Sequence, residues 1–197
     1  MSVCNMYERM PASLLRKADN PNFYLHGIKL PARICVSAPS GSGKSNMVVN
    51  FISLCSQGKG TFSNIHIVTK DSSEPLYDFL KMKSPQIQIT EGLHTLPDLK
   101  KFDKDESHLV VIDDLCLAKD QSSVLDYFIR CRKCGVTVMY LSQSYFKIPL
   151  IVRQNSNYLI VLGIGNKRSI SMMLNEVAIG ASKEQLARNQ GALDRAK

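Results

Sequence analysis

A run of small residues between an apolar stretch and a helix-like stretch constrains the fold more than any other feature of this sequence. Residues 38–45 are Ala-Pro-Ser-Gly-Ser-Gly-Lys-Ser and match the Walker A pattern, with Ala38 in place of its first glycine. Small side chains let the backbone N–H groups of such a turn approach a phosphate, and the following helix directs its positive end at the anion. The run therefore predicts a strand, a phosphate-binding turn and a helix, in that order.

This turn predicts a role for each of its polar residues. Lys44 is expected to reach the outer phosphates of ATP, and the Ser45 hydroxyl is expected to ligate Mg²⁺. Ala38 falls where the strand leaves the sheet, where a small residue other than glycine is tolerable. The expected nucleotide-binding residues are Pro39, Ser40, Gly41, Ser42, Gly43, Lys44, Ser45 and Asn46.

A second stretch has the form of a Walker B motif. Residues 109–112 are a continuous apolar run, as in a buried parallel strand, and Asp113 and Asp114 follow it. We expect Asp113 in the coordination shell of Mg²⁺ and Asp114 at the strand tip, where a carboxylate orients or deprotonates a water. Gln143 ends the next apolar run, and its amide is expected to sense the terminal phosphate and hold the water.

Phosphoryl transfer also gains from an arginine that meets the charge growing on the outer phosphate, by roughly 10³–10⁵ in rate. The candidates are Arg130, Arg132 and Arg153. Cations at a helix end often only complement the helix dipole, so the residues alone leave the choice open. The predicted catalytic set is therefore Lys44, Asp114, Gln143 and one of these arginines.

The hydrophobic pattern alternates between strands and helices. Strands are expected at 34–38, 64–69, 86–90, 109–112, 136–141 and 158–162, with the short strand 86–90 at an edge of the sheet. Helices are expected at 44–55, 74–82 and 121–133. Asp120 is expected to cap the last of these helices and Gly135 to follow its end. Such alternation predicts an α/β fold with a mostly parallel central sheet and helices on both faces. Ligands of these sheets bind beyond the carboxyl ends of the strands, where both motifs fall.

The chain length fits one domain with additional segments. We expect an N-terminal cap or subunit-contact segment at 1–30, a core at 31–180 and a C-terminal helical tail at 181–197. No apolar run approaches the ~20 residues that cross a bilayer, and residues 1–16 lack a secretory core. We therefore expect no membrane segment and a location inside the cell that makes the protein.

Charge and cysteine content narrow the partners. The formal charge is +8 and the isoelectric point about 9.2, which favours polyanion partners and nucleic acid first. Basic residues that could meet phosphates are Lys147, Arg153, Lys167 and Arg168. Cys131 and Cys134 form a CxxC pair, but no second pair follows at zinc-finger spacing, which favours ordinary packing.

Beyond the generic motifs, residues 132–135 (Arg-Lys-Cys-Gly), then a strand, then residues 142–144 (Ser-Gln-Ser) are similar to the FtsK–HerA superfamily of ring-forming DNA-pumping ATPases. Gln143 lies eleven residues beyond Arg132 (143 − 132), as in the arginine-to-glutamine arrangement of that superfamily. Within it, residues 142–149 (Ser-Gln-Ser-Tyr-Phe-Lys-Ile-Pro) and 151–155 closely resemble the genome-packaging ATPases of poxviruses, giant DNA viruses and their virophages. Residues 74–77 (Glu-Pro-Leu-Tyr) and the Asp-Asp pair also look like that branch, and the resemblance covers about residues 32–165.

This resemblance implies a RecA-like P-loop NTPase core of the additional-strand type. It implies a pentameric or hexameric ring around double-stranded DNA, with ATP between subunits and an arginine donated in trans, here Arg132. The implied function is to package a viral double-stranded DNA genome into the capsid while hydrolysing ATP to ADP and phosphate. Capsid or vertex proteins would be partners, and the location would be the viral factory in the host cytoplasm and, transiently, the assembling virion.

Three other functions fit the sequence less well. A P-loop kinase for a small acceptor would need an arginine-rich lid and an acceptor pocket, and no clear lid is visible. A GTP-driven switch would need an Asn-Lys-x-Asp segment late in the chain, and the Thr-Lys-Asp at 69–71 is too early and has the wrong spacing. The intact Lys44, Asp113 and Asp114 argue against a non-hydrolysing scaffold.

Overall fold

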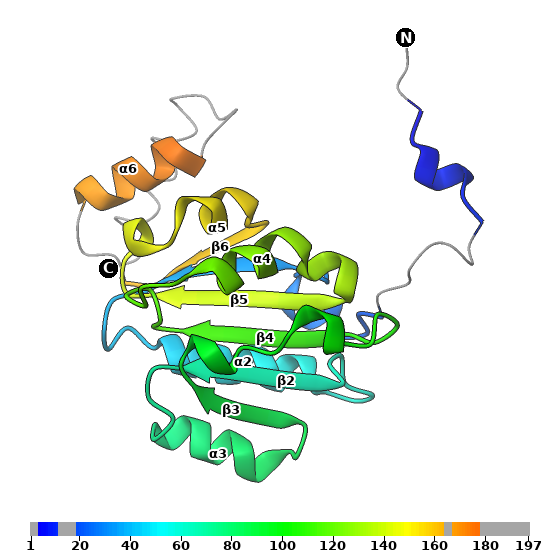
Figure 1. Ribbon diagram of the computed structural model, residues 1–197, viewed down its shortest axis with the longest axis horizontal. Coiled ribbons are helices and arrows are strands. Elements are labelled where there is room, and N and C mark those ends of the chain that lie inside the picture. The colour runs from blue at the N-terminus through cyan, green and yellow to red at the C-terminus, as the bar shows by residue number, and fades with distance from the viewer. Residues whose placement is uncertain (1–3, 12–18, 164–166, 178–197) are drawn as a thin grey trace.

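A single six-stranded sheet, with every pair of neighbouring strands parallel, forms the centre of the computed structural model, which describes residues 4–11, 19–163 and 167–177 (Figure 1). Its strands are β1 (Arg33–Ser37), β2 (Asn64–Thr69), β3 (Ile87–Glu91), β4 (His108–Asp113), β5 (Val136–Ser142) and β6 (Tyr158–Val161). Their order across the sheet is β3-β2-β4-β5-β1-β6, so β3 lies at an edge, as expected.

The position of β5 defines the subtype of the fold. It lies between β1, which leads into the Walker A turn, and β4, which carries the acid pair. Ser37 pairs with Ser142 and Asp113 with Leu141, so all three strands end at the same level. This inserted strand confirms the RecA-like fold of the additional-strand type.

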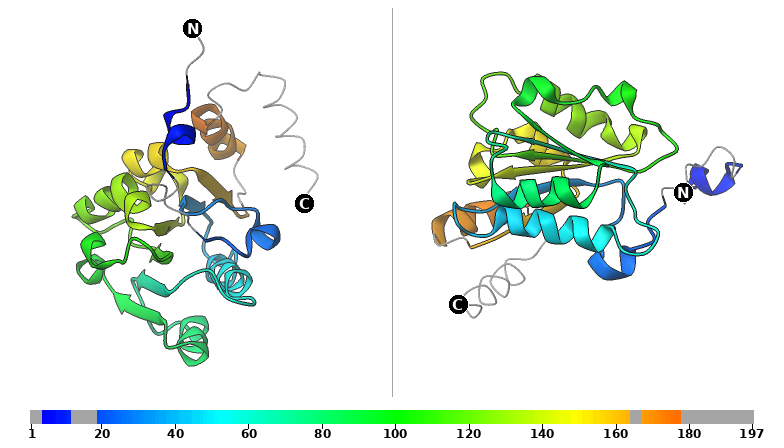
Figure 2. Two further views of the ribbon diagram at one scale, coloured as in Figure 1. Left: turned by 90° about the vertical axis from the view of Figure 1, so that its right-hand side faces the viewer. Right: turned by 90° about the horizontal axis from the view of Figure 1, so that it is seen from below.

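Helices cover both faces of the sheet. The helices are α1 (Phe23–His26), α2 (Lys44–Cys55), α3 (Pro75–Lys83), α4 (Ser122–Arg130), α5 (Leu150–Asn155) and α6 (Lys167–Val177). The 3₁₀ turns are η1 (Met6–Arg9), η3 (Leu93–Thr95), η4 (Leu99–Lys101), η5 (Cys131–Cys134) and η6 (Tyr145–Lys147). Figure 2 shows α2 and α3 on one face and α4 on the other, and α5 packs against α4.

The central strands alternate between two apolar layers. In β4, Leu109 and Val111 face the layer under α2 and α3, whereas Val110 and Ile112 face the layer under α4, and all four are fully buried. A parallel strand that is buried on both faces needs a continuous apolar run, which is why the 109–112 pattern predicted it.

The predicted helix 121–133 differs from the observed one at both ends. Gln121 is the N-cap, and Asp120 lies one residue earlier, where its Oδ1 accepts the N–H of Ser122 at 2.8 Å. The prediction of Asp120 as the cap was therefore wrong by one residue, because the carboxylate satisfies this amide from outside the helix. The α-helix ends at Arg130, and η5 continues it as a tighter turn that closes at Gly135 with a left-handed φ of 69°.

The two cysteines of the CxxC pair occupy this tighter turn. Cys131 is fully buried in the layer under α4, and Cys134 packs at its margin. Burial raises the pKa of the Cys131 thiol to about 12, so the thiol stays protonated and packs as a small apolar group.

The described part of the N-terminal segment contacts the end of α2. The Asn22 amide is buried and donates to the carbonyls of Cys55 (2.8 Å) and Gln57 (3.1 Å), and the His26 ring lies 5.5 Å from that of Phe51. The division of the chain at 30 and 180 stays a prediction, and the 181–197 tail lies outside the described residues. No helix within the described ranges is both long enough and apolar enough to span a membrane.

Candidate functional site

A cleft of about 640 Å³ opens at the carboxyl ends of the strands. Its lining comes from the Walker A turn, from the residues that join β2 to α3, from the end of β4 and from Gln143. These residues are Pro39, Ser40, Gly41, Gly43, Lys44, Ser45, Asn46, Thr69, Lys70, Asp71, Ser73, Glu74, Pro75, Leu76, Asp113, Asp114 and Gln143. The fold thus brings both predicted motifs and the predicted sensor to one cleft.

The Walker A turn is held open towards this cleft by its own geometry. Gly41 and Gly43 have φ angles of 73° and 89°, a backbone conformation that is strained for any residue with a side chain. The Ser42 hydroxyl donates to the Pro39 carbonyl at 2.6 Å, so its side chain shapes the turn. Because α2 begins at Lys44, the unpaired N–H groups of its first turn lie at the cleft, which suits an anion.

Ala38 shows why this Walker A motif does not need its first glycine. It is fully buried, its N–H donates to the Ser142 carbonyl at 3.0 Å, and its φ is not positive. It therefore extends the pairing of β1 with β5. The Lys44 ammonium lies 3.4 Å from the Ala38 carbonyl, across the turn from its own helix.

Asp113 is a buried carboxylate with one satisfied oxygen. Its Oδ2 accepts a hydrogen bond of 2.5 Å from the Tyr77 hydroxyl, and its buried Oδ1 has no hydrogen-bond partner within the described ranges. Burial raises the pKa of Asp113, while the Tyr77 hydrogen bond and the charge of Lys44 lower it. A buried carboxylate oxygen that lacks a donor is unusual and suits a cation ligand.

Ser45 lies close to the same group. Its side chain interacts with the Tyr77 hydroxyl, whose pKa is raised by burial and by the negative charge of Asp113. Two oxygen ligands at the phosphate end of the cleft fit a hydrated Mg²⁺, which is usually held by few protein oxygens together with phosphate oxygens. Asp113 and Ser45 are the residues that would hold it.

Asp114 and Gln143 contact each other. The Gln143 amide nitrogen donates to Asp114 Oδ2 at 2.7 Å, and the Asp114 N–H donates to the Leu141 carbonyl at 3.2 Å. In the described part of the chain, Asp114 is the only residue other than glycine with a positive φ, 55°. Such backbone strain often accompanies function, since the surrounding structure must stabilise it.

Sequence reasoning missed the part that Tyr77 and the β2–α3 connection play. The Ser72 N–H and hydroxyl both donate to Glu91 Oε1, at 2.9 and 2.7 Å, which fixes this wall of the cleft to the edge strand. Tyr77 belongs to the Glu-Pro-Leu-Tyr run that carries the resemblance, which was the available signal. A buried tyrosine early in a helix is otherwise typical of plain core packing.

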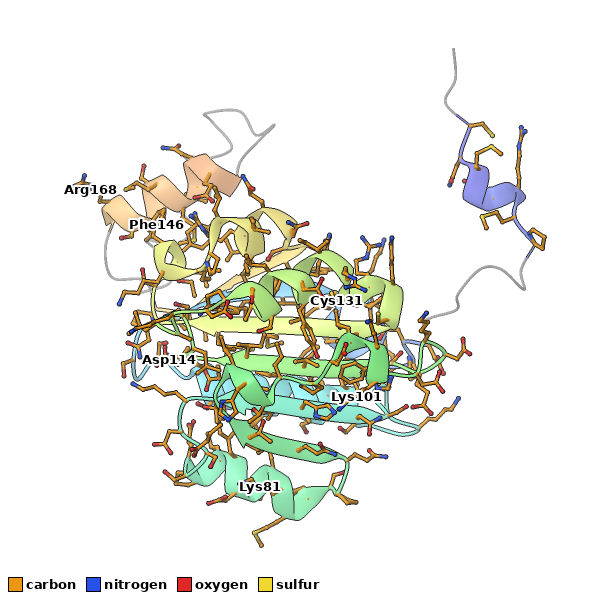
Figure 3. The ribbon with its side chains drawn as sticks, viewed as in Figure 1. Lys81, Lys101, Asp114, Cys131, Phe146 and Arg168 are labelled. Atoms are coloured by element: carbon orange, nitrogen blue, oxygen red, sulfur yellow. The ribbon has the colours of Figure 1, made fainter. Side chains whose placement is uncertain are left out.

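The three candidate arginines are absent from the lining of the cleft as far as the structure describes it. Arg132 is in η5, which leads into the amino end of β5, and a strand of 7 residues spans roughly 20 Å. Figure 3 labels Asp114 at one end of the sheet and Cys131, the neighbour of Arg132, towards the other. Arg132 therefore cannot reach the cleft of its own chain.

The three candidate arginines differ in what they contact. Arg130 pairs with Asp126 at 3.2 Å on the surface of α4. Arg153 pairs with Glu176 of α6 and lies 4.9 Å from the centre of the Tyr145 ring. The Arg132 side chain makes no hydrogen bond or ion pair to any residue that the structure describes.

Of the basic residues expected to meet phosphates, Arg153 points into the protein, with 12% of its side chain exposed. Lys147 and Arg168 are exposed, and the side chain of Lys167 lies outside the described part.

A parallel sheet with one inserted strand, and a cleft that joins a phosphate-binding turn to an acid pair, define a P-loop NTPase with a RecA-like core. The profile of the family described as "Poxvirus A32 protein" matches residues 25–196, and the chain belongs to that family. This membership confirms the resemblance that the sequence motifs indicated.

Solved structures share this fold at low sequence identity. The cytoplasmic domain of EssC is 15% identical over 77% of this chain and 34% of that one, with a TM-score of 0.56. The genome packaging NTPase B204 from Sulfolobus turreted icosahedral virus 2, in complex with ATP-gammaS, is 16% identical over 74% and 81%, with a TM-score of 0.52. The type VII secretion ATPase EccC of Thermomonospora curvata is 12% identical over 72% and 22%, with a TM-score of 0.56.

These identities show a common fold and no more. The chain spans about a third of the EssC structure and most of B204. No curated protein matches the chain.

Proposed function

We propose that the chain is an ATP-driven DNA translocase that packages a viral double-stranded DNA genome into the capsid, hydrolysing ATP to ADP and phosphate between subunits of a ring. Membership of the poxvirus A32 protein family supports this. So does the fold shared with B204, which is named as a genome packaging NTPase and binds ATP-gammaS. The net charge of +8 suits a partner whose phosphates are bound without sequence preference.

One observation carries the proposal: the predicted catalytic residues are divided between the two ends of the sheet. Lys44, Asp114 and Gln143 are at the cleft, and the residues described along its lining include no arginine. Arg132 lies at the opposite end, with no hydrogen-bond or ion-pair partner in the described ranges. A second copy of the chain would complete the catalytic residues if the amino ends of its strands, with Arg132, lay against the cleft of the first copy. A ring of five or six subunits would repeat this contact at every interface.

Each residue then has a definite part in hydrolysis. The N–H groups of the turn and Lys44 bind and orient the phosphates. Mg²⁺, when bound by Ser45 and Asp113, neutralises charge on the outer phosphate oxygens. Asp114 accepts a proton from the attacking water or orients it, and Arg132 of the neighbouring subunit meets the charge that develops on the terminal phosphate.

Gln143 connects the water to the phosphate in this scheme. Its amide nitrogen carries two hydrogens, and one is donated to Asp114. The other can contact the terminal phosphate, so a single amide positions the base relative to the group that is attacked.

The kinase alternative has less support from the site. A lid that closes on a transferred phosphate supplies cations, whereas the described lining of this cleft offers Lys44 and Lys70 but no arginine. Phosphate that appears on a small acceptor, rather than free in solution, would favour the kinase.

The proposed partners are double-stranded DNA, further copies of the chain, and capsid or vertex proteins. The proposed location is the viral factory in the host cytoplasm and, transiently, the assembling virion. Contacts to the DNA backbone release counterions, so DNA affinity should fall steeply with salt.

The decisive experiment measures ATP turnover with and without duplex DNA, across protein concentration and salt. We expect specific activity to rise with protein concentration as rings assemble, to rise further with DNA, and to lose the DNA effect at high salt. Lys44→Ala serves as the background control. Turnover that ignores both DNA and protein concentration would contradict the proposed translocase.

A further inference from the structure

Tyr77 connects helix α3 to the acid pair. It is fully buried, and its ring packs in the apolar layer between the sheet and helices α2 and α3. Its hydroxyl donates to Asp113 Oδ2 at 2.5 Å, a bond between residues 36 positions apart in the chain. Because the ring is enclosed on all sides, the hydroxyl has little freedom to swing away.

This bond fixes the orientation of the Asp113 carboxylate. A carboxylate rotates readily about its last single bond, so either oxygen could point at a cation. Because Oδ2 accepts the hydrogen bond from Tyr77, Oδ1 remains available to a cation. Oδ1 is buried without a hydrogen-bond partner among the described residues. Asp113 lines the cleft together with Ser45, the other residue that would hold Mg²⁺.

We propose that Tyr77 is a positioning residue for the magnesium site, which holds the Asp113 carboxylate so that Oδ1 stays available to Mg²⁺. The inference rests on the proposed binding of Mg²⁺ with ATP at this cleft, and it adds a residue that neither Walker motif contains. Groups that hydrogen-bond to metal ligands fix their orientation, and their removal typically lowers metal affinity by about 10–100-fold.

The simpler alternative is that Tyr77 only fills the core and takes Asp113 as a convenient acceptor. Tyr127 offers a matched comparison, since it is also buried and donates a 2.5 Å hydrogen bond, to the Pro97 carbonyl, on the opposite face of the sheet. Tyr77→Phe and Tyr127→Phe each delete one hydroxyl and leave every ring carbon in place. Loss of core stability should therefore be common to both variants, whereas loss of metal affinity should belong to Tyr77→Phe alone.

The test measures three quantities on the full chain. The first is affinity for a fluorescent ATP analogue in EDTA, which we expect to be unchanged in both variants. The second is affinity of the ADP-loaded protein for Mn²⁺, read by electron paramagnetic resonance, which we expect to fall about tenfold or more in Tyr77→Phe only. The third is turnover against Mg²⁺ concentration, where excess Mg²⁺ should restore much of the Tyr77→Phe rate.

Equal Mn²⁺ affinity in Tyr77→Phe and Tyr127→Phe would overturn the positioning role. So would an equal weakening of nucleotide binding by Tyr77→Phe with and without metal, because that result describes packing alone. The proposed function fails separately. A wild-type protein that binds Mn²⁺ and ADP at this cleft but turns over ATP without regard to DNA leaves the role of Tyr77 intact and removes the translocase.

Discussion

The two ends of the sheet differ in the polar side chains that they carry and in how these are paired. At the carboxyl end, side chains from four segments converge on a cleft, and a carboxylate oxygen of Asp113 is left for a ligand. At the amino end, the Arg33 guanidinium is held by the carbonyl of Phe128 and the side chains of Asn155 and Asn157. Burial lowers the pKa of Arg33, and the positive charge of nearby Arg132 lowers it further.

Arg33 and Arg132 are therefore near enough for each positive charge to oppose the other. Arg130 and Arg153 each have a carboxylate partner, whereas Arg132 has none among the described residues. This difference between the ends supports the proposal that Arg132 of one subunit completes the cleft of the next, whose described lining offers Lys44 and Lys70 but no arginine. The first two predictions test whether the two ends form one site between subunits, and the others test residues within one chain.

The largest expected effect is that of Arg132→Ala. Turnover should fall by roughly 10³–10⁵, with folding and ATP binding retained, because the terminal phosphate loses the arginine proposed to reach it from the neighbouring subunit. Steady-state phosphate release and binding of a fluorescent ATP analogue measure the two properties. Arg130→Ala, which removes a neighbouring arginine that already has a partner, should leave turnover within a few-fold of wild type.

Mixed rings sharpen this test. Arg132→Ala subunits combined with Lys44→Ala subunits should recover part of the activity, since each supplies what the other lacks at a shared interface. If verified mixed rings recover no ATP turnover at any ratio, Arg132 does not act on a neighbour's cleft, and the two ends of the sheet do not form one site.

The next effect concerns the carboxyl end alone. Asp114→Asn keeps the shape of the side chain and an oxygen that can accept from Gln143, but it removes the base, so turnover should fall by about 10²–10⁴. Affinity for ATP should change little. Asp71→Asn, at another carboxylate that lines the cleft, is the control and should stay within a few-fold of wild type. An active Asp114→Asn would transfer water activation to a different group.

The contrast between the ends also marks what the sequence could predict. The Walker A turn and β4 followed from short contiguous patterns, because a phosphate cradle and a doubly buried strand each impose strict local composition. The boundary between α4 and η5 did not, since a 3₁₀ turn and an α-helix satisfy similar residues.

Long-range pairs were the least predictable part of the candidate site. The Tyr77–Asp113 bond joins residues 36 apart through two different elements, and the Arg153–Glu176 pair occupies an arginine that the sequence left open as a trans donor. Neither pair leaves a periodic signal, because its geometry depends on the assembled sheet.

Arg153→Ala is expected to act on stability. Its contact with Glu176 and the Tyr145 ring joins α5, α6 and η6, and its loss should lower the free energy of unfolding by roughly 2 kcal/mol, as for a partly buried hydrogen bond between charged groups. Urea unfolding measures this. Lys81→Ala, which breaks the exposed pair with Asp78, should cost about 0.5 kcal/mol or less. If folded Arg153→Ala were inactive and rescued by Lys44→Ala subunits, Arg153 would replace Arg132 as the trans arginine.

The smallest effect compares the left-handed residue at each end. Gly135, with φ of 69°, closes η5 behind Arg132, whereas Asp114, with φ of 55°, sits at the cleft. Gly135→Ala should lower the free energy of unfolding by about 1 kcal/mol, and Gly135→Asn by less, since asparagine tolerates this conformation better than alanine. Urea unfolding again measures the change, and ATP turnover at a protein concentration high enough for full ring assembly is the second measurement. If the left-handed conformation of Gly135 serves only to end the helix, turnover per folded subunit should stay near wild type in both variants. Should Gly135→Asn stay stable but lose turnover as Arg132→Ala does, the turn would be setting the direction of Arg132 rather than merely closing the chain into β5.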